Sequence, residues 1–281
     1  MSVSLLRTIS ETRACIAAAR ARGLSIGLVP TMGALHEGHG ALIRKAREGT
    51  GFVVVTIFVN PIQFDRPEDL EKYPRDLDTD IAFCDRLGAD AVFAPDAIEM
   101  YPTQLLTSVA VAGISTRLEG EFRPGHFRGV ATVVAKLFNI VLADRAYFGE
   151  KDAQQLAVIQ KMVADLDFPV QIVPVATVRE PDGLAMSSRN RRLTPEQRSI
   201  APLLYQALCA AERLIQTGSR SAAEVREIAI KILTQNPAIC IEYLEVVDPA
   251  TFQPVDTLSR GVVVAAAVWL GQVRLIDNVK V

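Results

Sequence analysis

The feature that most constrains the fold is an alternation of short apolar runs with helical patterns over about the first 180 residues. The runs have strand length, carry no charged residue and are rich in β-branched side chains, which is typical of parallel strands buried on both faces. They lie at residues 25–31, 52–59, 91–95, 146–149 and 170–178. Helical patterns fall between them near residues 38–48, 78–88, 130–142 and 152–166. This alternation predicts an α/β fold, a Rossmann-like doubly wound parallel sheet.

The last hundred or so residues follow a different pattern, in which helices come before consecutive strands. A helix is expected over 194–218, with Thr194 as its N-cap and Pro195 in its first turn, and a second near 221–235. Three strands are then expected at 240–248, 261–269 and 272–279. We therefore expect two domains, a doubly wound domain at 1–182 and a smaller C-terminal α+β domain at 183–281.

Charge and cysteine content exclude several classes of protein. The 281 residues carry a formal net charge of −2, so there is no overall basic field to hold nucleic acid, and no nucleic-acid partner is expected. The four cysteines are far apart and form no CxxC pair, which predicts reduced core residues in a reducing compartment, the cytoplasm. They are Cys15, Cys84, Cys209 and Cys240.

The N-terminus and the most apolar stretch give no sign of a membrane partner. Arg, Glu and Thr interrupt the first 23 residues too often for a signal-peptide core. The preferred interpretation is a first amphipathic helix, although the arginines also fit a transit peptide. Its apolar side would be formed by Leu5, Leu6, Ile9, Cys15 and Ile16. The run at 261–271 is about half the length that a bilayer requires.

Two of the chain's three histidines, His36 and His39, stand one helical turn apart in the segment "PTMGALHEGHG". They follow a predicted strand and open a predicted helix. The start of a helix offers backbone N–H groups and the positive end of the macrodipole, which attract anions. Gly33 and Gly38 permit a close approach of ligand to backbone. The pattern is typical of a polyphosphate site.

A zinc site and the common nucleotide-binding motifs fit this segment less well. A zinc protease needs HExxH, whereas HEGH is one residue short and no third ligand cluster is evident. The chain has neither GxxxxGK[ST] nor GxGxxG. Two surface histidines beside a glycine-rich turn remain the structural alternative.

The segment resembles the HxGH signature of the nucleotidyltransferase superfamily, whose members cleave ATP between its α- and β-phosphates. More narrowly, "PTMGALHEGH" is similar to the N-terminal motif of the pantothenate synthetases, or pantoate–β-alanine ligases. HxGH alone is shared by many adenylyltransferases, so other stretches must carry the narrower match.

Three further stretches resemble the same family. "FVNPIQF" (58–64) places Gln63 just past a buried strand, at the sheet edge where α/β enzymes bind ligands, and the resemblance implies that Gln63 binds pantoate. "GEKDAQQ" (149–155) matches the family's GEKDxQQ, with Ala153 where an aromatic is usual. "DGLAMSSRN" (182–190) matches DGLAxSSRN, although "RNRRL" departs from the tyrosine common near Arg192. Taken alone, the second stretch could equally be an N-capped helix and the third a linker.

The resemblance implies a set of site residues. His39, His36, Lys151 and Arg189 would be catalytic, Gln63 and Gln155 would bind pantoate and β-alanine, and Asp152 would lie near Mg²⁺. The residues expected to bind ATP are Met32, Gly33, Ala34, Leu35, His36, Glu37, Gly38, His39, Gly149, Glu150, Lys151, Asp152, Val178, Met186, Ser187, Ser188 and Arg189. His126, the third histidine, lies in another similar stretch, but a lone histidine more often caps or packs than reacts.

The implied activity is the ATP-dependent joining of (R)-pantoate to β-alanine through pantoyl adenylate, with ATP as substrate, Mg²⁺ as cofactor and a homodimer as the assembly. Domain 1–182 would bind ATP and pantoate, and domain 183–281 would close over the site. An adenylyltransferase with a phosphorylated acceptor, an aminoacyl-tRNA synthetase and a nucleotide sensor without turnover are the alternatives. Whether His39 acts as a proton donor or as an electrostatic clamp is left open by the sequence.

Overall fold

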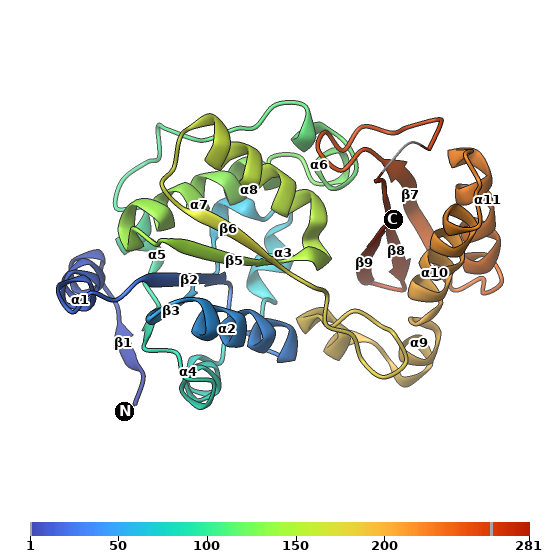
Figure 1. Ribbon diagram of the computed structural model, residues 1–281. Coiled ribbons are helices and arrows are strands. Elements are labelled where there is room, and N and C mark those ends of the chain that lie inside the picture. Colours follow the sequence, from blue (N-terminus) through green and yellow to red (C-terminus); the bar gives the residue numbers. More distant parts are fainter. Residues whose placement is uncertain (1, 259–260) are drawn as a thin grey trace. The chain divides into compact units, whose positions relative to one another are not determined.

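The computed structural model describes residues 2–258 and 261–281, and these divide into two compact units (Figure 1). The N-terminal unit comprises Met1–Glu150 and Val158–Ala176. The C-terminal unit comprises Lys151–Ala157 and Thr177–Val281. Each unit has its own sheet and its own core, and each is described by itself.

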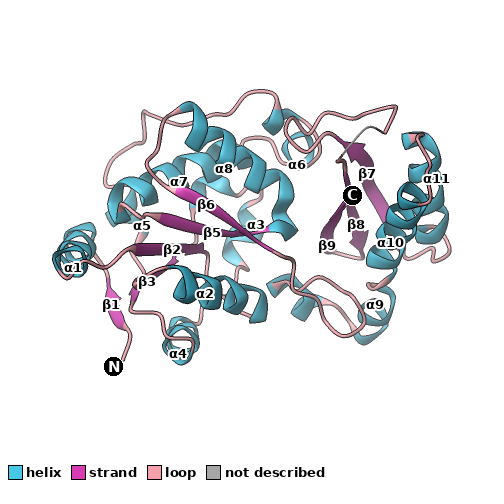
Figure 2. Ribbon diagram, viewed as in Figure 1, coloured by secondary structure: helices cyan, strands magenta, loops and turns pink. Residues whose placement is uncertain are grey.

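The N-terminal unit is built on a six-stranded parallel sheet in the order β1-β4-β3-β2-β5-β6 (Figure 2). Its strands are β1 (Ser4–Leu6), β2 (Ile26–Thr31), β3 (Phe52–Ile57), β4 (Ala91–Phe93), β5 (Arg145–Gly149) and β6 (Gln171–Val175). The chain runs outward from β2 through β3 to β4, then returns to place β5 on the other side of β2. The strand order therefore reverses between β2 and β5, at the kind of switch point where open α/β sheets bind ligands.

Helices cover both faces of this sheet. The α-helices are α1 (Ile9–Ala21), α2 (Glu37–Gly49), α3 (Pro67–Glu71), α4 (Leu77–Arg86), α5 (Ala97–Met100), α6 (Glu119–Phe122), α7 (His126–Val141) and α8 (Ala153–Asp165). Short 3₁₀ turns are η1 (Pro61–Gln63), η2 (Ile114–Thr116) and η3 (Glu150–Asp152). The end of η3 and the start of α8, Lys151–Ala157, belong to the C-terminal unit. Helices α2 and α4 lie on one face and α7 on the other (Figure 1). Ile43 and Ala46 of α2 pack against Val53 and Val55 of β3, all with no exposed surface, so the predicted doubly wound α/β fold is confirmed.

The N-terminus differs from the predicted single amphipathic helix. Leu5 and Leu6 lie in β1, which pairs with β4, and Leu5 is 41% exposed. Helix α1 begins only at Ile9, because Thr8 caps it through a capping box with Glu11.

The C-terminal unit packs two helices against a three-stranded antiparallel sheet in the order β7-β8-β9. Its elements are η4 (Ser188–Arg192), α9 (Pro195–Ile200), α10 (Leu203–Gln216), α11 (Ala222–Leu233), β7 (Ile239–Val247), β8 (Val263–Leu270) and β9 (Val273–Lys280). Helices α10 and α11 bury Leu208 and Leu233 against Val264 and Leu270 of β8. The predicted α+β character of this region is therefore observed.

Two further predictions need correction. The helix expected over 194–218 is two helices, because Pro202 has no N–H and stands as the N-cap of α10. Its predicted start is right, since Thr194 accepts from the Gln197 N–H in a capping box. Of the four cysteines expected in the core, only Cys84 is buried; Cys15 and Cys209 are half-buried, and Cys240 is exposed at the second position of β7.

No helix within residues 2–258 and 261–281 is both long and apolar enough to cross a bilayer. The most apolar run of the chain forms β8, the central strand of the antiparallel sheet. Seven of the eight residues of β8 are buried, so this run serves the core of the C-terminal unit.

Candidate active site

The predicted ligands of the N-terminal unit gather at the carboxyl edge of the parallel sheet. The HEGH segment follows β2, Gln63 follows β3, and Gly149 and Glu150 stand at the end of β5. Strands β2, β3 and β5 are consecutive neighbours in the sheet, so these segments emerge from the same edge, around the switch point.

A buried carboxylate fixes the loop between β2 and α2. Asp80 of α4 is 3% exposed and accepts from the Ala34 N–H at 2.8 Å (Oδ2) and from the Leu35 N–H at 2.8 Å (Oδ1). The loop needs unusual backbone angles, with φ of +84° at Gly33 and +51° at Ala34. A Cβ at Gly33 would lie 2.9 Å from Asp80 Oδ2, so glycine is also required for space. Asp80 thus holds the loop that leads to His36.

The two histidines of this loop cap the helix that they open. His36 is the N-cap of α2, and its Nδ1 accepts from the Gly38 N–H at 3.1 Å. His39 Nδ1 accepts from the His36 N–H at 3.3 Å, and the two ring centroids are 4.2 Å apart. Because each Nδ1 accepts, each neutral ring carries its proton on Nε2. The two rings therefore accept from the His36 and Gly38 N–H groups and present an N–H donor of their own at Nε2.

Gln63 is fixed at both its side chain and its main chain. It ends η1 and is 7% exposed. Its Oε1 accepts from Asn60 Nδ2 at 2.9 Å, and its Nε2 lies 2.8 Å from Met32 Sδ. Met32, Gly33, Phe58 and Pro61 line a cavity of about 390 Å³ at the ends of β2, β3 and β4. The amide nitrogen of Gln63 therefore faces a side chain of the cavity wall.

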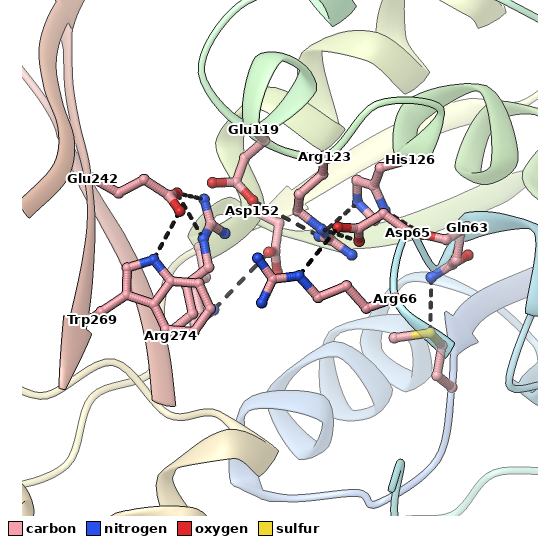
Figure 3. Close-up of polar contacts among 12 residues, drawn as sticks. Gln63, Asp65, Arg66, Glu119, Arg123, His126, Asp152, Glu242, Trp269 and Arg274 are labelled. Carbon is pink, nitrogen blue, oxygen red and sulfur yellow. Dashed lines mark hydrogen bonds and ion pairs between the residues drawn. The ribbon is translucent and has the colours of Figure 1, made fainter. Parts of the chain in front are cut away.

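His126 holds the main chain of Gln63 (Figure 3). His126 is 8% exposed, and its Nδ1 donates to the Gln63 carbonyl at 2.8 Å, because that oxygen can only accept. Nε2 then accepts from Arg123 at 3.1 Å, and Arg123 also contacts Asp65 at 3.3 Å and Glu119 at 3.8 Å. These contacts make His126 a support for Gln63.

The C-terminal unit gathers the predicted cationic and hydroxyl groups. Ser187 caps η4, and its hydroxyl accepts from the Arg189 N–H at 3.2 Å. Lys151, Ser187 and Arg189 line one small cavity, together with Asn190, Arg274 and Asp277. The Met186 N–H donates to the Val178 carbonyl at 2.9 Å, which draws those two predicted residues together. Residues far apart in the sequence thus meet around one small hollow that has both polar and apolar walls.

Strand β9 anchors the backbone at Lys151. Asn278 Nδ2 donates to the Lys151 carbonyl at 2.9 Å, and the Lys151 side chain is 17% exposed. The neighbouring Asp277 is buried, which raises the pKa of its carboxyl, while two hydrogen bonds from Arg179 oppose that rise. Arg179 also stacks on the Tyr205 ring at 3.6 Å. The Arg179–Asp277 ion pair therefore lies next to the residue that holds the Lys151 backbone.

Asp152 could offer one carboxylate to a metal ion. Its side chain is 47% exposed and lies 4.0 Å from Lys151 Nζ. Over residues 2–258 and 261–281, no group of three or more His, Cys, Asp or Glu side chains could hold a metal ion. A single carboxylate fits Mg²⁺ that is held mainly by substrate phosphates and water.

Three further predicted residues, Gln155, Ser188 and Glu37, lie at the start of helices. Gln155 is half-buried in the first turn of α8, and Ser188 begins η4. Glu37 is the first residue of α2 and pairs with Arg44 at 2.7 Å.

Several supporting residues escaped the sequence-based prediction. Asp80 and Asn278 lie far along the chain from the backbone groups that they hold, and so does Tyr101, whose hydroxyl donates to Asn60 Oδ1 at 2.8 Å. No spacing in the sequence signals these three residues. Asn60 had a signal, because it stands three residues before Gln63 in the "NPIQ" turn.

The fold and the geometry define an α/β enzyme whose candidate site lies at the switch point of a parallel sheet. A family model described as pantoate-beta-alanine ligase matches residues 4–280. The pantothenate synthetase of Moorella thermoacetica is 54% identical over 277 residues, which cover 99% of this chain and 98% of that protein. That of Thermotoga petrophila is 49% identical over 276 residues, covering 98% and 99%.

Solved structures agree with these relatives. The crystal structure of pantothenate synthetase from Thermus thermophilus matches with a TM-score of 0.94 and 46% identity, covering 99% of both chains. A pantoate-beta-alanine ligase from Francisella tularensis, complexed with beta-gamma ATP and beta-alanine, matches with a TM-score of 0.80 and 33% identity, covering 99% of this chain and 97% of that one. The chain belongs to the pantoate–β-alanine ligase family, and the enzyme class predicted from the sequence is confirmed.

Proposed function

We propose that the chain joins (R)-pantoate to β-alanine in two steps through a pantoyl adenylate. In the first step the pantoate carboxylate attacks the α-phosphorus of ATP, and the bond to pyrophosphate breaks. In the second step the β-alanine amine attacks the activated carbonyl carbon, the bond to AMP breaks, and the amine loses a proton. The reaction needs no protein nucleophile, so catalysis comes from positioning and from stabilising charge on the phosphates.

The observation that carries the proposal is the imidazole pair at the start of α2. Both rings use Nδ1 for helix capping, which places the proton of each neutral ring on Nε2. A donor at a helix N-terminus suits a phosphate oxygen, where the macrodipole adds to the hydrogen bond. His39 would be the principal catalytic group and His36 its partner. The remaining residues from Met32 to Gly38, with Gly149 and Glu150, would contact ATP alongside them.

Permanent charge for the leaving pyrophosphate would come from the C-terminal unit. Lys151 and Arg189 line one cavity with Ser187, which combines cations with a hydroxyl donor. Ser188, Val178 and Met186 would complete the nucleotide contacts. Asp152 would hold Mg²⁺ together with substrate oxygens and water, and the ion would supply positive charge to the phosphates.

Neutral amides would bind pantoate, and this separates the proposal from related reactions. Gln63 and Gln155 can hold a carboxylate and hydroxyls without overneutralising the carboxylate, which must stay nucleophilic. An enzyme that adenylylates a phosphorylated acceptor would instead need Arg or Lys in the acceptor pocket. Gln63 is held by a further amide and a thioether, which favours the unphosphorylated acceptor.

Three wider features belong to the same proposal. Domain 1–182 would carry ATP and pantoate, and domain 183–281 would close over them. Two copies of the chain would form a homodimer. The enzyme would act in the cytoplasm, in keeping with cysteines that form no disulfide in the structure.

The test is isotope exchange between labelled pyrophosphate and ATP, with pantoate present and β-alanine omitted. The proposal predicts exchange that depends on pantoate, because only formation of the adenylate returns label to ATP. Adding β-alanine should then yield AMP and pantothenate in equal amounts. Exchange without pantoate, or ADP as the nucleotide product, would contradict the proposed mechanism.

A further inference from the structure

The side-chain amide of Gln63 has a donor end and an acceptor end, and the end that faces the substrate decides what it can bind. Oε1 accepts from Asn60 Nδ2 at 2.9 Å, which leaves Nε2 on the side of Met32 and the cavity wall. The orientation of Gln63 therefore depends on the orientation of Asn60.

The orientation of Asn60 is in turn set by a backbone carbonyl. Asn60 has no exposed surface, and its Nδ2 also donates to the Gly129 carbonyl at 3.2 Å. A carbonyl can only accept, so the nitrogen of Asn60 must lie on that side. Close packing of α7 on η1 makes the contact possible, since a Cβ at Gly129 would lie 2.4 Å from the Ile62 carbonyl oxygen.

Tyr101 completes the chain of hydrogen bonds. Its hydroxyl donates to Asn60 Oδ1 at 2.8 Å, which satisfies the remaining end of a fully buried amide. Burial raises the pKa of Tyr101 above its ordinary value, so the hydroxyl keeps its proton and remains a donor. Lys136 lies over the same ring, with Nζ 5.5 Å from its centroid. A lysine ammonium can only donate, so Lys136 does not compete with Asn60 Oδ1 for the Tyr101 hydroxyl proton.

We propose that Tyr101 is a positioning residue for the pantoate reaction. Acting through Asn60, it holds the Gln63 amide with Nε2 toward the substrate, so this corner selects an acceptor that presents oxygen lone pairs there, a hydroxyl or a carboxylate. The inference rests on the proposed role of Gln63 in binding pantoate. It specifies that role further, because Gln63 acts as a hydrogen-bond donor to the substrate and Tyr101 maintains that orientation.

A double-mutant cycle between Tyr101→Phe and Gln63→Ala tests the proposal, with the KM for pantoate measured in the pantoate-dependent exchange reaction. Tyr101→Phe should raise this KM about three- to tenfold, the effect of one lost hydrogen bond, and leave the KM for ATP unchanged. In the Gln63→Ala background the same substitution should change the KM for pantoate by less than about twofold, because its target is gone.

Tyr147→Phe is a matched control. Tyr147 is 1% exposed, and among the described residues its hydroxyl has no hydrogen-bond partner, so removing it should leave both KM values as they are. Should the two effects in the cycle multiply, Tyr101 does not act through Gln63 and the inference is overturned. A Gln63→Ala enzyme with an unchanged KM for pantoate would also overturn it, but by removing the proposed role of Gln63 itself.

The variant Asn60→Asp gives an independent measurement. A carboxylate at this position cannot donate to Gln63 Oε1, so the amide would turn its oxygen toward the substrate. The KM for pantoate should rise at least as far as in Gln63→Ala, while an unchanged value would contradict the proposed direction.

Discussion

Under the proposed function, the two units would contribute different kinds of group. The N-terminal unit would contribute neutral groups, His36, His39 and Gln63, and each of them is held by hydrogen bonds to backbone or buried side chains. The C-terminal unit would contribute Lys151 and Arg189, whose charge acts over a wider range of distance and angle than a hydrogen bond. A neutral donor is useful only when it is oriented, whereas a cation mainly needs to be near.

This difference predicts two signatures. Substitutions in the N-terminal unit should affect one substrate or one step, since a directed hydrogen bond serves one atom. Substitutions of the cations should weaken the interaction with ATP, and the size of that effect should fall as ionic strength rises, because salt screens charge. Each prediction below tests one side of that contrast.

The largest effect is expected for His39→Ala. The adenylation rate should fall by about 10²- to 10⁴-fold, the usual range for a positioned acid–base or donor group. The measurement is single-turnover formation of AMP-linked product with saturating pantoate. His39→Asn is the informative companion, because its Oδ1 can still accept from the His36 N–H while the donor at the Nε2 position is lost. It should be as slow as the alanine variant, and a rate near that of the unchanged enzyme would reduce His39 to a helix cap.

Lys151→Met should come next, with kcat lowered by about 10²- to 10³-fold, as for the loss of one group that stabilises charge in a transition state. Methionine keeps most of the length and removes the charge. The KM for ATP of the unchanged enzyme should also rise with added KCl more steeply than that of the variant. Lys161→Met makes the same change at an exposed position of α8, where Lys161 pairs with Asp165, and should leave both quantities unaltered. Equal salt dependence in all three proteins would argue against a direct charge contact.

Gln63→Ala should raise the KM for pantoate by about 10- to 100-fold, the value of a hydrogen bond to a charged group, and leave ATP binding nearly intact. Gln63→Glu should be worse for pantoate, because a carboxylate can accept from Asn60 but cannot donate to the substrate. Titration of each variant with ATP and with pantoate separates the two effects. Loss of ATP binding with pantoate spared would show that the pocket is assigned wrongly.

Much of the fold could be predicted because parallel strands and their helices leave strong local patterns. Buried runs such as 52–59 identified the sheet, and cap residues such as Thr194 identified a helix start. The wrong predictions arose where a local helical pattern was overridden by strand pairing or by a proline. Leu5 and Leu6 fit a helical face, yet pairing with β4 takes them into β1. The prediction of one helix over 194–218 did not take account of Pro202, at which the segment divides into α9 and α10.

The candidate site could be predicted only in part. Short motifs pointed to His36, His39, Gln63 and Lys151 as candidates, since binding residues often lie in loops after strands. The residues that hold these candidates in place could not be found from motifs, because only the packing of the folded chain brings them near. Asp80 lies 46 residues from Ala34, and Tyr101 lies 41 from Asn60.

The smallest effect is expected for Asp80→Asn, which weakens the support and leaves every proposed ligand in place. The new amide can accept from one of the Ala34 and Leu35 N–H groups but must present its own N–H₂ to the other, so the free energy of unfolding should fall by about 1–3 kcal/mol. Because this loop leads to His36, kcat should also fall about five- to tenfold, as a small displacement of oriented donors is costly. Asp78→Asn changes the same residue type on the exposed side of α4 and should alter neither quantity. Thermal unfolding and kcat measured on both variants check the prediction. A destabilised Asp80→Asn enzyme with unchanged kcat would mean that the imidazoles hold their place without the loop, and the contrast between oriented and merely nearby groups would then be weaker than the structure indicates.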